Sequence, residues 1–172
     1  MRIGVVKINR NTYVEDAIKK LGHTPVVLQI NDEDLVKKIK ESSIQKWIFT
    51  GTGIAVSVLN PLAPQVPMEI LKMKDKVFFL ICYSMESVLY QMGYPIKQRS
   101  SKKKEFFQLD EIKAYRNHQF YTPVEALDTR VTLVNSYRGE VMTVFYKNTL
   151  MTQWHPERSK DGIQCLKAWM EY

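Results

Sequence analysis

Short apolar segments alternate with amphipathic segments through the first half of the chain, and this alternation constrains the fold more than any other feature. The order is strand, helix, strand, helix, strand, over Arg2 to Lys7, Thr12 to Leu21, Thr24 to Ile30, Asp32 to Ser42 and Lys46 to Thr50. Such alternation favours a parallel sheet with helices on both faces. Right-handed crossovers then place the carboxyl ends of the strands on one edge, where open α/β sheets have their binding sites.

A cysteine follows the most apolar segment of the chain. Lys76 to Ile81 is a nearly continuous apolar run and predicts a buried central strand. Cys82 comes directly after it, and Ser84 to Met92 predicts a helix that Gly93 ends. The partial positive charge of a helix N-terminus favours a thiolate, so a cysteine at this turn is a candidate nucleophile.

The second half changes from alternation to a series of short strands. Glu105 to Tyr115, Arg130 to Ser136, Glu140 to Tyr146 and Leu150 to Gln153 are the predicted strands, and Ser159 to Glu171 is a predicted terminal helix. Turn-like tripeptides before and after the third of these strands indicate antiparallel neighbours. We therefore expect a single domain over residues 1–172, with a mostly parallel central sheet and antiparallel strands in its C-terminal half.

Composition narrows the class of protein. The chain has 172 residues, of which 45% are hydrophobic, enough for one domain with its own core. No apolar run reaches the roughly 18 residues of a membrane helix, and the N-terminus has no signal-peptide pattern. We expect a soluble cytoplasmic protein that does not contact membranes. Its two cysteines, Cys82 and Cys165, are expected to be free thiols, with Cys165 inert.

The net charge of +7 does not by itself specify a partner. Its densest source is Arg99 to Lys104, which we interpret as a solvated surface loop, because nucleic-acid binders usually have extended basic patches with interleaved aromatic residues. Nucleic acid is therefore not expected as a partner. The sequence lacks zinc-ligand spacing, a phosphate loop and a dinucleotide fingerprint, so we expect neither a metal nor a cofactor.

A second group of reactive side chains lies between the last strand and the terminal helix. The sequence there is Gln153-Trp154-His155-Pro156-Glu157. Cysteine attacks as the thiolate, so it needs an imidazole to take its proton, and a carboxylate behind that imidazole fixes the tautomer. Cys82, His155 and Glu157 could supply these three groups, since such residues meet in the fold and not along the chain.

These motifs resemble those of the class I glutamine amidotransferases, whose glutaminase domains carry a Cys-His-Glu triad on a flavodoxin-like sheet. Gln153 to Glu157 matches four of five positions of the family's Gln-Phe-His-Pro-Glu sequence, with Trp154 in place of phenylalanine. Ile81-Cys82-Tyr83 is similar to the version in guanosine monophosphate synthetase glutaminase domains. The resemblance extends from the first strand to the C-terminal helix.

The resemblance implies a role for each matching residue. Cys82 would attack the side-chain amide of glutamine, His155 would protonate the departing ammonia and then activate water, and Glu157 would hold His155. Backbone N–H groups of Tyr83 and of Gly51 or Thr52 would form the oxyanion hole. Asn117 and His118 resemble the Ser-His pair that helps to hold the substrate. Ammonia would pass to a separate synthetase subunit.

The nucleophile turn departs from the family pattern at three positions. Leu80 and Ser84 replace two glycines, and Glu86 replaces the glutamine that lines the family's substrate pocket. A carboxylate cannot donate as an amide does. Three functions therefore stay open: a glutaminase that serves a separate synthetase, a related hydrolase of gamma-glutamyl or other amides, and a catalytically degenerate amidotransferase-like domain that binds or regulates a partner.

Overall fold

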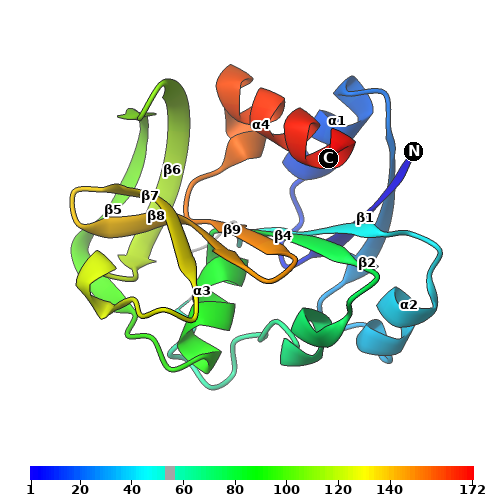
Figure 1. The fold of residues 1–172 in the computed structure, drawn as a ribbon, viewed down its shortest axis with the longest axis horizontal. Coiled ribbons are helices and arrows are strands. Elements are labelled where there is room, and N and C mark those ends of the chain that lie inside the picture. The colour runs from blue at the N-terminus through cyan, green and yellow to red at the C-terminus, as the bar shows by residue number, and fades with distance from the viewer. Residues whose placement is uncertain (53–56) are drawn as a thin grey trace.

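A seven-stranded sheet forms the centre of the computed structural model, which describes residues 1–52 and 57–172 (Figure 1). Its strands are β1 (Arg2–Lys7), β2 (Thr24–Gln29), β3 (Lys46–Phe49), β4 (Val77–Ile81), β7 (Thr132–Tyr137), β8 (Glu140–Tyr146) and β9 (Thr149–Thr152). The order is β2-β1-β3-β4-β9-β8-β7, and the first five strands in it run parallel. β8 is antiparallel to β9, and β7 is antiparallel to β8. The expected mostly parallel sheet with antiparallel C-terminal strands is confirmed.

Helices cover both faces of this sheet, as the strand-helix alternation predicts (Figure 1). The helices α1 (Tyr13–Lys20) and α4 (Lys160–Glu171) pack on one face, where Val5 and Ile48 point. On the other face lie α2 (Leu35–Glu41), α3 (Tyr83–Gln91) and the 3-10 turn η1 (Met68–Lys72). Successive strand residues point to opposite faces, so strands buried on both sides must be apolar throughout, as β4 is.

The candidate site residues follow neighbouring strands at one edge of the sheet. β3 and β4 end together, with Phe49 opposite Leu80, and β4 ends beside β9, with Ile81 opposite Thr152. Gly51, Cys82 and Gln153 therefore come one or two residues after three adjacent strands. The topology explains why groups far apart in the sequence meet here.

Beside this edge, the chain forms a two-stranded hairpin that the sequence analysis predicted wrongly. One strand was expected over Glu105 to Tyr115, whereas the structure has β5 (Lys97–Leu109) and β6 (Ile112–Tyr121). The chain reverses at Asp110, whose φ of 51° lies in the left-handed region that aspartate tolerates better than most residues. No Asn-Gly or Asp-Gly pair marks this turn, so its sequence signal is weak.

The basic segment Arg99 to Lys104 was also predicted wrongly, because it belongs to β5 and is not a loop. Its backbone pairs with β6, with Lys104 opposite Asn117, while Lys102 and Lys104 stay exposed. Lysines are typical of exposed strands, where their charge opposes further strand pairing. Pairing with β6 fixes the end of this segment at Lys103 and Lys104, whereas a register shift between Gln98 and Lys103 leaves Arg99 to Lys102 without regular partners.

Within residues 1–52 and 57–172, no helix has the length and apolarity that crossing a membrane requires. The same residues contain no cluster of three or more His, Cys, Asp or Glu side chains arranged to hold a metal ion. Gly53, which follows Gly51 and Thr52 after β3, and residues 54–56 lie outside the described residues.

Candidate active site

Cys82 occupies a sharp turn between β4 and α3. Its φ is 52° and its ψ is −107°, a combination that residues other than glycine rarely adopt. Backbone conformations of this kind cost about 1–3 kcal/mol and persist where the surrounding structure enforces them. The Cys82 amide donates to Thr152 O at 2.6 Å, and α3 begins at the next residue. This is the geometry of a nucleophile elbow, in which the reactive atom stands between a strand and a helix N-terminus.

His155 and Glu157 lie together in the connection between β9 and α4. The Nδ1 atom of His155 is 2.8 Å from Glu157 Oε1, and both side chains are less than a tenth exposed. The backbone amide of His155 donates to Tyr115 O of β6 at 2.7 Å. The carboxylate therefore occupies Nδ1 and leaves Nε2 of the imidazole for other chemistry, as in nucleophile-base-carboxylate triads.

Gly51 shows how closely the three segments approach one another. A Cβ atom at this position would lie 3.1 Å from Cys82 Cβ and 3.2 Å from His155 Cε1. The turn after β3, the cysteine and the imidazole are thus in van der Waals contact around one point. The imidazole of His155 hydrogen-bonds to the Cys82 thiol as well as to Glu157. Because Glu157 holds Nδ1, the buried Nε2 is the atom left to exchange a proton with the thiol.

The electrostatics of the site couple Cys82 to His155. Burial raises the pKa of the Cys82 thiol, whereas the adjacent His155 lowers it. Burial alone would lower the pKa of His155, but Glu157 and Cys82 raise it well above its usual value. His155 is therefore a stronger base than a free histidine, and a charged imidazole would favour the thiolate beside it.

Gln153 contacts both Glu86 of α3 and the Cys82 thiol. Its Nε2 donates to Glu86 Oε1 at 2.8 Å and lies 3.6 Å from Cys82 Sγ. Glu86 is 3% exposed, and burial raises its pKa to about 7, although Gln153 and His155 act to lower it. A protonated Glu86 is close to a glutamine in shape and charge, so this residue keeps a neutral partner beside the thiol over part of the physiological pH range.

We expect Glu86→Gln to stabilise the protein at alkaline pH. Glu86 has a pKa of about 7 in the folded protein against a usual 4.5. The free energy of unfolding that Glu86 takes from the protein therefore grows as pH rises from 4.5 to 7 and reaches its full value above 7. This pKa difference of two to three units corresponds to about 3 kcal/mol of unfolding free energy. Glu86→Gln should therefore be more stable than the native protein by about this amount at pH 8 and equally stable at pH 4.5. Urea unfolding at several pH values measures this, with exposed Glu41→Gln as the control. Equal stability of Glu86→Gln and the native protein at pH 8 would contradict it.

The two positions that lack the family glycines fit the turn without displacing it. Leu80 is fully buried in the core on the α2 and α3 face of the sheet. Ser84 is also buried, and its Oγ donates to Thr50 O at 2.7 Å, which links the start of α3 to the end of β3. Both side chains stabilise the elbow, so the altered sequence is compatible with its strained backbone.

The Asn117–His118 pair on β6 is split between two environments. The backbone carbonyl oxygen of Asn117 accepts from Cys82 Sγ at 3.9 Å. His118 faces the other way, where its Nδ1 is 2.8 Å from Phe120 O and its Nε2 is 3.8 Å from Glu140 Oε2. Burial lowers the pKa of His118 to about 4, so its imidazole is neutral at pH 7. The structure thus brings Asn117, but not the His118 side chain, to the thiol.

A buried ionic cluster, formed by Arg99, Arg116 and Glu140, holds β6 in this position. Arg99 pairs with Glu140 of β8, and Arg116, 1% exposed, pairs with Glu105 of β5 and lies 3.9 Å from Glu140. Removing one partner of such a cluster leaves an uncompensated buried charge, which is strongly destabilising. Because residues alternate along β6, this cluster anchors the face of the strand opposite to the one that contacts Cys82.

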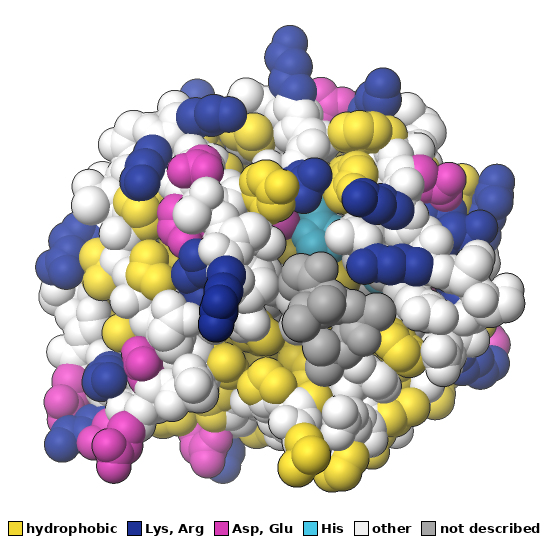
Figure 2. Space-filling view, turned by 180° about the vertical axis from the view of Figure 1, so that it is seen from behind, with side chains coloured by type: hydrophobic (Ala, Val, Ile, Leu, Met, Phe, Trp, Pro, Cys, Tyr) yellow, Lys and Arg dark blue, Asp and Glu magenta, His cyan; other side chains and the backbone are white. Residues whose placement is uncertain are grey.

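A polar cavity of about 310 Å³ opens beside His155. Figure 2 shows a hollow with a histidine at its bottom and Lys or Arg side chains around it. The lining comes from the loop after β1, the first residue of α1, the turn after β3, the hairpin and the segment 155–158: Asn9, Asn11, Tyr13, Thr52, Lys104, Asn117, His155, Glu157 and Arg158. This cavity is the candidate substrate pocket.

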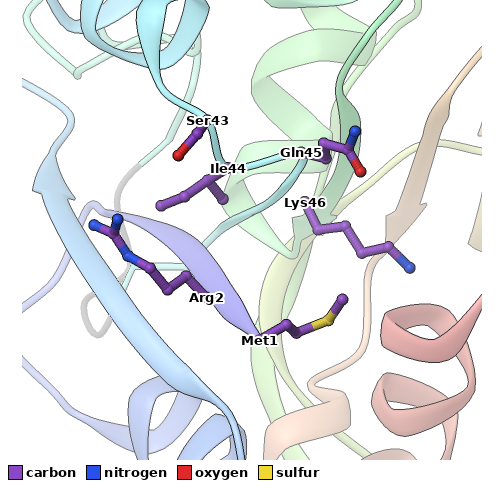
Figure 3. A pocket seen from close by; sticks show the side chains of 6 residues that line it. All are labelled: Met1, Arg2, Ser43, Ile44, Gln45 and Lys46. Carbon is purple, nitrogen blue, oxygen red and sulfur yellow. The ribbon is translucent and has the colours of Figure 1, made fainter.

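A second cavity, of about 250 Å³, lies at the opposite edge of the sheet, where β1 and β3 begin (Figure 3). Lys46, one of its lining residues, donates from Nζ to Trp169 O at 3.0 Å and to Met170 O at 2.6 Å. A cation at a helix C-terminus satisfies free carbonyls there. The described residues that line this cavity include no thiol, imidazole or carboxylate, so we place the chemistry at the first cavity.

Comparison with known proteins supports the fold. No family model matches the chain, and no curated protein matches it by sequence. Among solved structures, the chain is similar to a protein of Thermoplasma acidophilum that is provisionally assigned as one of the subunits of GMP synthase. The TM-score is 0.78 at 15% sequence identity, over 99% of this chain and 92% of that one. The chain has the fold of that protein.

The fold agrees with the sequence resemblance, but the sequence did not indicate several residues of the site. The Gln153–Glu86 contact was not anticipated, although both residues belong to motifs that were recognised. Nor were Asn9, whose Nδ2 donates to Gly51 O, and Arg158, which lines the cavity. Asn9 had a usable signal, since it follows β1 at the carboxyl edge, where polar residues tend to serve binding sites.

Proposed function

We propose that this chain is a glutaminase that hydrolyses the side-chain amide of glutamine through Cys82, His155 and Glu157. The observation that carries this proposal is the close packing of Cys82, in its strained turn, against Gly51 and His155. A thiol, a base with raised pKa and an orienting carboxylate are the groups that amide hydrolysis through a thioester requires. The similarity in fold to a protein assigned to GMP synthase supports the same function.

In the proposed reaction, the Cys82 thiol gives its proton to His155 and the sulfur attacks the amide carbon. Backbone N–H groups of Tyr83 and of Gly51 or Thr52 stabilise the oxyanion, at about 10²–10³ in rate for each donor. His155 then protonates the departing nitrogen, ammonia leaves, and a thioester forms. Water, deprotonated by His155, attacks the thioester and releases glutamate. A neutral Glu86 places no second negative charge beside the thiolate. We assign Asn117 to substrate binding.

We propose a separate synthetase as the acceptor of the ammonia. The similar protein is provisionally assigned as one of the subunits of GMP synthase, which supports a partner that carries the synthetic step. Isolated activity would then be weak and would rise in the presence of the partner. Glutamine-dependent formation of the aminated product by the mixture, which persists when free ammonia is scavenged, would identify such a partner.

The decisive experiment is labelling by a glutamine-analogue diazo-ketone, followed by mass spectrometry. The expected result is stoichiometric modification of Cys82, with Cys165 unmodified, and formation of glutamate from glutamine by the unlabelled protein. A related amide hydrolase would instead leave Cys82 unlabelled by this analogue yet reactive toward small alkylating agents. A binding or regulatory domain would have a Cys82 that is unreactive toward both, which would overturn the proposal.

A further inference from the structure

Arg158 enters the candidate substrate pocket as a fixed cation. Its guanidinium lies 3.9 Å from the ring centre of Tyr13 and 4.9 Å from that of Tyr115. Stacking on aromatic rings orients a guanidinium without neutralising it and reduces the entropy that it loses on binding. Over residues 1–52 and 57–172, the structure gives Arg158 no ion pair with a carboxylate. Its charge is therefore available to a ligand.

Lys104, on β5 of the hairpin, lines the same cavity. It too forms no ion pair with a described carboxylate, in contrast to the arginines of the buried ionic cluster. Glu157 is the acidic residue of the lining, and its Oε1 is already held by His155 at 2.8 Å. Two cations from different elements thus face a polar cavity in which Glu157 pairs with the imidazole through Oε1, while its Oε2 is buried without a partner among the described residues.

We propose that Arg158 and Lys104 form an anion subsite that binds the carboxylate of the amide substrate. This inference rests on the proposed function, because it takes the anion that the two cations bind to be the carboxylate of the amide that Cys82 attacks. A guanidinium binds a carboxylate through two parallel hydrogen bonds, and a lysine adds a mobile point charge. The subsite therefore selects amides that carry a carboxylate over neutral amides of the same length.

Equilibrium binding tests the subsite without turnover. Glutarate, its neutral diamide glutaramide and inorganic phosphate are the probes, and isothermal titration is the measurement. Glutarate is expected to bind more tightly than both others. Arg158→Gln and Lys104→Gln should each weaken glutarate binding about tenfold, as the loss of a hydrogen bond to a charged group does. Lys103→Gln, the same change at the adjacent residue outside the cavity lining, is the control and should bind as the native protein does.

Arg158→Lys separates charge from packing, because it keeps the cation but loses the planar stacking on Tyr13 and Tyr115. It should bind glutarate more tightly than Arg158→Gln, and thermal unfolding of both variants reports any loss of fold. Unchanged glutarate binding in the Lys104→Gln, Arg158→Gln double variant would overturn the subsite. So would tighter binding of phosphate than of glutarate, since the site would then not be one for a carboxylate.

Activity measurements keep this inference distinct from the proposed function. If the chain hydrolyses glutamine, the double variant should raise KM for glutamine by a larger factor than KM for glutaramide. Hydrolysis of glutamine with the native KM in the double variant would overturn the subsite and leave the glutaminase intact. Glutarate binding that depends on both cations, in a protein with no amide hydrolysis, would overturn the proposed function and leave the subsite intact.

Discussion

Replacement of Cys82 by serine is expected to lower glutamine hydrolysis by about a thousandfold or more. The hydroxyl is a far weaker nucleophile than the thiolate, and the site is arranged around sulfur: the thiol is buried, and Gln153 Nε2 and Asn117 O lie at sulfur-contact distances of 3.6 Å and 3.9 Å. The strained backbone of residue 82 should persist, because serine has the same shape up to the γ atom. Release of glutamate from glutamine, with or without a partner synthetase, is the measurement.

Two further variants make the result specific. Cys165→Ser is the control, because Cys165 lies on α4, packs beside the cluster around Trp154 and takes no part in the site; its activity should equal that of the native protein. His155→Ala should lose about as much activity as Cys82→Ser, and the double variant little more, because residues that act as a unit are strongly non-additive. Additive losses, or full activity in Cys82→Ser, would refute the proposed nucleophile.

The sequence predicted the central sheet well because its strands are buried on both faces. β4 must be apolar at every position, and β1 and β3 nearly so, which leaves a pattern that no amphipathic helix shares. The parallel topology then determines where the strands end. The positions of Gly51, Cys82 and His155 at one edge followed from this topology, and the structure brings them together.

The hairpin and the pocket were harder to predict because their determinants are not local. The β5–β6 turn depends on the left-handed conformation of Asp110, and in the basic part of β5 only Lys103 and Lys104 pair with β6, beside a register shift. The Gln153–Glu86 contact joins residues 67 positions apart, and the pKa of Glu86 follows from burial by the whole fold. Arg158 has no signature in sequence either, since Tyr13 and Tyr115 reach it from distant segments.

Gly162→Ala is expected to damage both stability and activity, although glycine-to-alanine changes within helices usually stabilise by up to about 1 kcal/mol. Gly162 lies in the first turn of α4, where a Cβ atom would come within 2.4 Å of Pro156 O and 2.6 Å of Pro156 Cα. These are backbone atoms of the residue between His155 and Glu157, so the clash cannot be relieved by turning a side chain. Overpacking of this kind costs about 1–3 kcal/mol, occasionally more, which exceeds the helix-propensity gain.

The same clash would move the imidazole away from Cys82, because α4 is fixed through Leu166 and Met170 in the core and the segment 155–158 is the part that can yield. A displacement of about 1 Å in a catalytic group can lower the rate about a hundredfold. Urea unfolding and glutamate release measure the two effects, and Gln164→Ala, at an exposed position of the same helix, is the control. A Gly162→Ala protein as stable and active as the native one would show that the segment 155–158 is not held by this contact.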